Sequence, residues 1–154
     1  MIWTSFHRRG EILRDVIASA DRRRDGHLPT EVPGVAQTFA DELALLGALQ
    51  LRWHTRLAGR IERELMGQPM DLEAAVVTAW QTAAADLPGI RAILDREHAA
   101  PRSAAVADAL AKARTKEHAL LAMMAGLASG PGDAAARAGA VIVERARLEA
   151  AVAA

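Results

Sequence analysis

A Glu-His-Ala triplet occurs twice in the sequence, and its residue types could do chemistry. One copy is Glu97, His98 and Ala99, and the other is Glu117, His118 and Ala119. A carboxylate beside an imidazole could bind a metal ion or transfer protons. On one continuous helix the two copies would lie about 30 Å apart, and Pro101 between them interrupts such a helix. We therefore treat them as two separate features.

The first copy lies at the end of a predicted helix, directly before Ala-Ala-Pro. Asp95 and His98 have the i, i+3 spacing that places a carboxylate and an imidazole on one helix face. Two potential ligands at a helix end do not make a metal site, and the helix dipole alone favours a histidine there. We expect this copy to be a solvated helix end.

The second copy differs because Glu117 falls at the centre of an apolar stripe. The stripe repeats at alternating steps of four and three residues, as expected of a helix packed against neighbours. Its members are Val106, Leu110, Ala113, Glu117, Leu120, Met124 and Leu127. Burying a carboxylate is costly unless it is paired, hydrogen-bonded or protonated. Glu117 therefore requires a partner, whereas His118 lies among alanines that predict either a close helix approach or a packed, partly wet histidine.

The candidate partners of Glu117 are Gln50, Trp53 and His54, on a predicted long helix over residues 35–66. Gln50 is central in the apolar seam of that helix, His54 is about 40° away, and a buried Trp53 N–H needs an acceptor. We favour a structural hydrogen-bond layer that fixes helix register. The alternative is an internal small-ligand site, or a metal held by His54 and Glu117. The Glu-x-x-His spacing of ferritin-like bundles is absent, and no cofactor is required by these residues.

The same long helix carries the candidates for an interaction surface. Leu45, Leu49 and Leu51 lie outside its seam, so either other helices surround this part of the helix or a second subunit covers it. An exposed apolar patch of this kind usually marks an interface. Four arginines share another face, and they are Arg52, Arg56, Arg60 and Arg63. They could hold an acidic partner or a phosphate backbone. The alternative is a solvated face, because Glu64 follows Arg60 by one helical turn and the composition is rich in arginine.

These residues are positioned by a chain that Pro and Gly divide into helices. The segments between these breakers show helical periodicity, and no segment alternates as a strand would. We predict an all-α fold, an antiparallel bundle of about five to six helices with a long central second helix, in a single domain of residues 1–154. The predicted helices are 5–24, with Phe6 and Leu13 on its inner face, then 35–66, 71–87, 89–98 as a short helix or a kinked continuation, 103–129 and 133–152.

The composition narrows the classes of function. Basic and acidic residues balance at 19 each and there is no cysteine, so nucleic acid is not an expected partner and thiol chemistry is excluded. No apolar stretch reaches the length of a membrane span, and we expect a cytoplasmic protein. No nucleophile or phosphate-loop motif is present. We expect a non-catalytic protein that acts through protein–protein interaction or regulation, as a homodimer with an unidentified protein partner.

Overall fold

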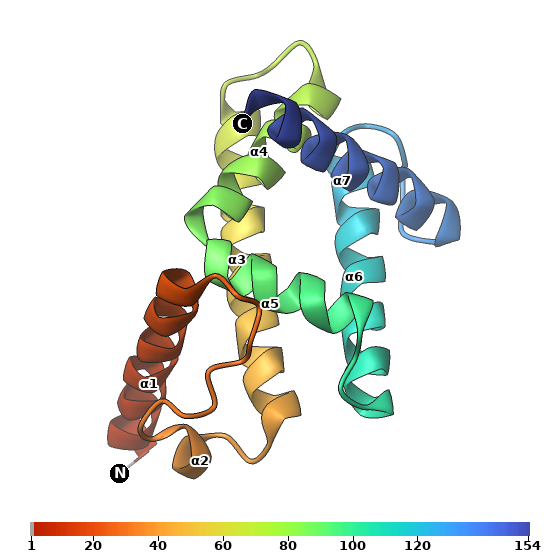
Figure 1. Ribbon diagram of the computed structural model, residues 1–154. Coiled ribbons are helices and arrows are strands. Elements are labelled where there is room, and N and C mark those ends of the chain that lie inside the picture. Colours follow the sequence, from red (N-terminus) through yellow and green to blue (C-terminus); the bar gives the residue numbers. More distant parts are fainter. Residues whose placement is uncertain (1) are drawn as a thin grey trace. The chain divides into compact units, whose positions relative to one another are not determined.

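The computed structural model describes residues 2–154, and every regular element in this range is a helix (Figure 1). The helices are α1 (Ile2–Arg23), α2 (Val35–Thr38), α3 (Glu42–Met66), α4 (Leu72–Asp86), α5 (Pro88–Ala99), α6 (Ala104–Met124) and α7 (Asp133–Ala153). The prediction of an all-α fold is confirmed for the described residues. None of these helices is both long enough and apolar enough to cross a membrane.

Residues 35–66 do not form the single long helix that we predicted. The chain leaves helical geometry at Phe39, whose φ of −109° and ψ of 128° are those of extended backbone. A separate helix, α3, begins at Glu42. Asp41 explains this new start, because its Oδ1 accepts a hydrogen bond from the Ala44 N–H at 2.8 Å and so caps the first turn. At 25 residues α3 is nevertheless the longest described helix.

Other predicted helix starts agree with the structure. Asp71 accepts a hydrogen bond from the Ala74 N–H at 2.9 Å and caps α4. The Ser103 hydroxyl does the same for α6, where it accepts the Val106 N–H at 3.1 Å. Pro88 stands at the first position of α5, where its missing N–H costs nothing.

Two predicted helix ends are wrong. α1 begins at Ile2, so Ser5 lies inside the helix and does not cap it. α6 ends at Met124, five residues before the predicted end. Gly126 causes this early stop, because its φ of 75° is left-handed and breaks the helical path.

The helices divide into two compact units. The first consists of Met1–Trp53 and Leu87–Leu110, and the second of His54–Asp86 and Ala111–Ala154. Both α3 and α6 contribute residues to each unit. The organisation of residues 1–154 as a single domain stays a prediction.

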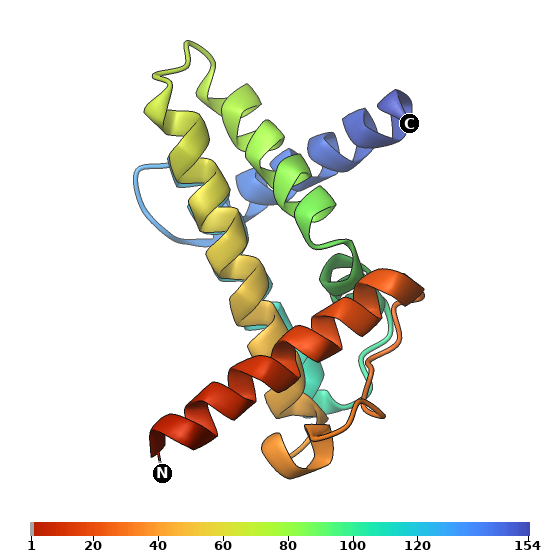
Figure 2. The same cartoon turned by 90° about the vertical axis from the view of Figure 1, so that its left-hand side faces the viewer.

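In the first unit α1 packs against α5 (Figure 2). Gly89 makes this approach possible, because a Cβ atom there would lie 2.4 Å from the carbonyl carbon of Ala20. The Gly89 N–H also donates a hydrogen bond of 2.9 Å to Asp21 Oδ1. The glycine and the capping aspartate together fix the end of α1 on the start of α5.

In the second unit α4 packs against α7. The α6 and α7 helices approach closely at Gly139, where a Cβ atom would lie 1.7 Å from the His118 carbonyl oxygen. His118 is itself half-buried. Gln81 adds a link between α4 and α7, since its Nε2 donates a hydrogen bond of 3.0 Å to the Ala146 carbonyl oxygen. The small residues around His118 thus accompany a close helix approach, as the sequence predicts.

Candidate functional site

The predicted polar layer contains both buried and exposed residues. Glu117 is 6% exposed, as its place in the apolar stripe predicts, and it makes at least one polar or electrostatic interaction. Trp53 is buried, Gln50 is half-buried and the His54 side chain is exposed. Gln50 and Trp53 belong to the first unit, and His54 and Glu117 to the second. That the four residues form one layer stays a prediction.

Within the first unit, Trp53 has a neighbour that the sequence reasoning missed. The Arg91 guanidinium of α5 stacks over the Trp53 ring, 4.5 Å from its centroid. Asp95, one turn further along α5, holds the same guanidinium at 3.0 Å. Asp95 is therefore an ion-pair partner that orients Arg91 on the indole face.

Glu97 is not the solvated residue that we expected. It is 2% exposed, and its Oε1 accepts a hydrogen bond of 2.7 Å from Arg102 Nε, while the Arg102 backbone N–H donates to Oε2 at 3.3 Å. Arg102 also bridges to Glu42 in the first turn of α3, at 2.8 Å. The hydrogen bond with Glu97 raises the pKa of Arg102. The chain turns back at Pro101, and this turn brings the compensating cation onto the carboxylate.

The predicted apolar interaction surface is covered. Leu45 and Leu49 are buried, and of the three leucines outside the seam only Leu51 is exposed. These two side chains belong to the core of the chain.

The arginine stripe is partly neutralised within the second unit. Asp86, at the end of α4, accepts hydrogen bonds from Arg60 Nε at 2.7 Å and from Arg56 Nη1 at 3.2 Å. The hydrogen bond from Arg60, followed by that from Arg56, holds the pKa of Asp86 below its ordinary value. Of the other two arginines, Arg52 is half-buried and Arg63 is exposed. Asp86 was not identified from the sequence, because 26 residues separate it from Arg60.

An apolar groove lies on the second unit, between the last turns of α3 and the end of α6. Its volume is about 440 Å³, and it is lined by Ala58, Ile61, Glu62, Leu65, Met66, Leu120 and Met124. The α3 residues repeat at i, i+3, i+4, i+7 and i+8, so they form one helix face. Glu62 is the only charged side chain among them. Met66 is 77% exposed, which leaves the groove open at that side.

Further exposed apolar residues come directly after the ends of α3 and α6 in the sequence. Met70 lies in the turn after α3, Leu72 begins α4 and Leu127 follows α6, and all three are exposed. Leu72 reaches the turn after α6, because its Cδ1 would lie 3.4 Å from a Cβ atom at Gly126. Flexible methionine side chains beside leucine are typical of surfaces that bind apolar helices of varied shape.

A second apolar surface lies on the first two turns of α1, in the first unit. Ile2, Trp3 and Phe6 are exposed there. Phe6 is 74% exposed, which contradicts its predicted place on an inner face. Beside these residues is an open hollow of about 850 Å³, lined by Ile2, Ser5, Phe6, Arg8, Arg9, Gln37 and Thr38. Arg9 stacks on the Phe39 ring at 4.6 Å, which anchors α1 beside α2.

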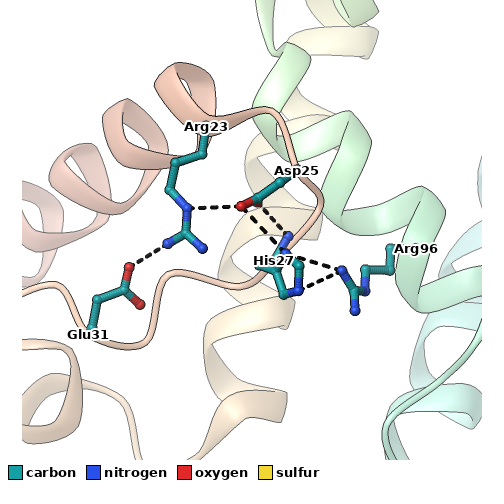
Figure 3. Close-up of polar contacts among 5 residues, drawn as sticks. All are labelled: Arg23, Asp25, His27, Glu31 and Arg96. Atoms are coloured by element: carbon teal, nitrogen blue, oxygen red, sulfur yellow. Dashed lines mark hydrogen bonds and ion pairs between the residues drawn. The ribbon is translucent and has the colours of Figure 1, made fainter.

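A polar cluster orders the loop between α1 and α2. Arg23 donates hydrogen bonds to Asp25, at 3.1 Å, and to Glu31 (Figure 3). Asp25 Oδ1 accepts the His27 N–H at 2.9 Å, and this bond, with the charge of Arg23, lowers the pKa of Asp25. Arg96 of α5 lies 2.9 Å from His27 Nε2. The cluster lies at the surface and ties the loop to α1 and α5.

In the described part of the chain, no group of three or more histidine and carboxylate side chains is placed to hold a metal ion. Comparison of the chain with protein families, curated proteins and solved structures finds no significant match. The groove between α3 and α6 offers apolar contact and one carboxylate, that of Glu62.

Proposed function

We propose that the chain is a non-catalytic helical protein that acts by binding another protein, as a homodimer in its simplest form. The groove between the ends of α3 and α6 is the observation that carries this proposal. Its apolar lining, with Met66 and Met124 at the open side, suits the apolar face of a helix. We also propose that the helices form an antiparallel bundle, in which α3 is the long central helix and carries one side of the groove.

The chemistry of the groove defines the helix that would bind. Apolar anchors at i and i+4 would contact the α3 face, because two turns of a helix present such a pair side by side. Glu62 favours a basic residue near those anchors, since it is the one charge in the lining. The partner is thus an amphipathic helix with a positive charge next to its apolar face.

Methionine methyl NMR tests this function directly. The chain has five methionines, and two of them, Met66 and Met124, line the groove. A synthetic amphipathic helix of leucine and lysine, added to chain labelled with ¹³C at the methionine methyls, should shift these two signals in a saturable way. A peptide of the same composition, with its leucines spread around the helix, is the control.

A matched pair of variants distinguishes peptide binding in the groove from nonspecific peptide binding elsewhere on the chain. Met66→Lys places a positive charge in the groove, whereas Leu148→Lys places the same charge on the exposed surface of α7. Met66→Lys should weaken peptide binding at least tenfold, as read from the Met124 methyl, and Leu148→Lys should leave it unchanged. Equal weakening by both variants, or equal binding of the two peptides, would refute the function.

A further inference from the structure

We propose that the occupant of the groove is the N-terminal end of α1 from a second copy of this chain. The inference rests on the proposed function, and it names the partner. It starts from an apolar face of α1 that is covered along part of its length only. On a helical wheel Ile2, Phe6, Leu13 and Ala20 fall within about 40° of one another. Leu13 and Ala20 are buried, whereas Ile2 and Phe6 are exposed.

The residue types of this segment match what the groove requires. Ile2 and Phe6 are spaced i, i+4, and Trp3 lies beside them. Aromatic side chains of this size supply most of the contact energy in protein interfaces when they enter an apolar pocket. The groove offers isoleucine, leucine and methionine side chains for that contact. Methionine adapts its shape to such a ring more readily than a branched side chain does.

The charges of the two surfaces are opposite. Residues 2–9 contain Arg8 and Arg9 and no acidic residue. Glu62 is the one charged residue in the groove lining. A helix end that carries both apolar anchors and arginines therefore meets an apolar groove with a carboxylate at its rim. This complementarity favours a second copy of the chain, because each copy carries both surfaces.

The contact is heterologous, since different surfaces of the two copies meet. Such a contact gives a reciprocal dimer when each copy donates its α1 to the other, and a longer assembly when it does not. This property separates the proposal from a symmetric pairing of α1 with α1 or of groove with groove.

Complementation between two variants tests the proposal. Phe6→Glu removes the inserted anchor, and Met124→Lys blocks the groove. Light scattering after size exclusion should show wild-type chain heavier than a monomer, and each variant alone as a monomer. An equimolar mixture should recover a species with one chain of each variant, because one intact α1 can then enter one intact groove. Helical circular dichroism and cooperative melting check that both variants are folded. If the variant at position 6 is not folded, Phe6→Ser replaces it, and if the variant at position 124 is not folded, Met124→Gln replaces it.

Several outcomes would overturn this assignment. A mixture that stays monomeric excludes a heterologous contact. A wild-type chain that is monomeric at high micromolar concentration excludes it as well. If the amphipathic peptide still shifts Met66 and Met124 in that case, binding of a helix by the groove stands, whereas the homodimer and the identity of the partner are wrong.

Discussion

Gly139 of α7 lies directly against the backbone of His118 in α6. A Cβ atom at Gly139 would be 1.7 Å from the His118 carbonyl oxygen, a distance that real atoms do not reach. The second unit therefore depends on a glycine within a helix, a position where glycine is otherwise unfavourable.

The first prediction concerns this contact. Gly139→Ala should lower the free energy of unfolding by about 3 kcal/mol or more, because α6 and α7 must separate to admit the methyl group. Gly59→Ala is the control, since Gly59 lies inside α3 with no atom near its Cβ position. That change should stabilise the chain by up to about 1 kcal/mol. Urea unfolding compares the two, and equal effects would rule out the close approach.

The second prediction concerns the ion pair of the first unit between buried Glu97 and the more exposed Arg102. Glu97→Gln should cost about 2 kcal/mol or more, because it removes the charge that pairs with the Arg102 guanidinium and puts an NH₂ donor in place of one of the two oxygens that accept from Arg102. Glu42→Gln is the matched control, since Glu42 is a more exposed partner of the same arginine. It should cost less than about 1 kcal/mol. If Glu42→Gln lowers the free energy of unfolding more than Glu97→Gln does, in thermal or urea unfolding, then Glu97 is not the main partner of Arg102.

The third prediction is a pH dependence that comes from Asp86. Its pKa is lowered in the folded chain by Arg60 and Arg56, so the pairs contribute stability above the ordinary carboxyl value, about 4, and lose it as pH falls through the lowered pKa. Wild-type chain should therefore lose about 1 kcal/mol more than Asp86→Asn on acidification from neutral pH. Parallel pH dependences of the two proteins in urea unfolding would show that Asp86 contributes nothing.

The fourth prediction concerns Glu117 and the predicted polar layer. If its role is only structural, Glu117→Gln is tolerated or stabilising, because a neutral amide costs less to bury than a carboxylate. Urea unfolding and metal content, measured on protein purified without a His-tag, check this. A bound metal in the wild type that disappears in a folded Glu117→Gln chain would instead support the ligand site with His54.

The all-α fold and the burial of Glu117 could be predicted from the sequence, because both follow from local periodicity. It did not predict the break at Phe39, since the capping of α3 by Asp41 interrupts an apolar pattern that continues through it. The burial of Glu97 depends on Arg102, which only the turn at Pro101 brings back. The contact between Glu97 and Arg102 could be predicted only if the direction of the chain after the turn at Pro101 were known.

The groove could not be predicted for a related reason. Leu120 and Met124 continue the apolar stripe of α6 and were expected to face a neighbouring helix. Whether a stripe is covered depends on where its neighbours end, and here α3 ends at Met66 and α6 at Met124. The same is true of Phe6, which continues the buried face of α1 beyond the residues that cover it.

An intermolecular spin-label experiment tests the central claim most directly. The chain has no cysteine, so Thr4→Cys places a single nitroxide near the start of α1, two residues from Phe6 and outside the helix face that carries Ile2 and Phe6. The spin-labelled chain carries no isotope label. It is mixed with wild-type chain that is labelled with ¹³C at the methionine methyls. We predict strong paramagnetic broadening of the Met66 and Met124 methyl signals, and its loss when the spin-labelled chain also carries Phe6→Glu. Unbroadened Met66 and Met124 signals at a concentration where the chain is dimeric would contradict the account.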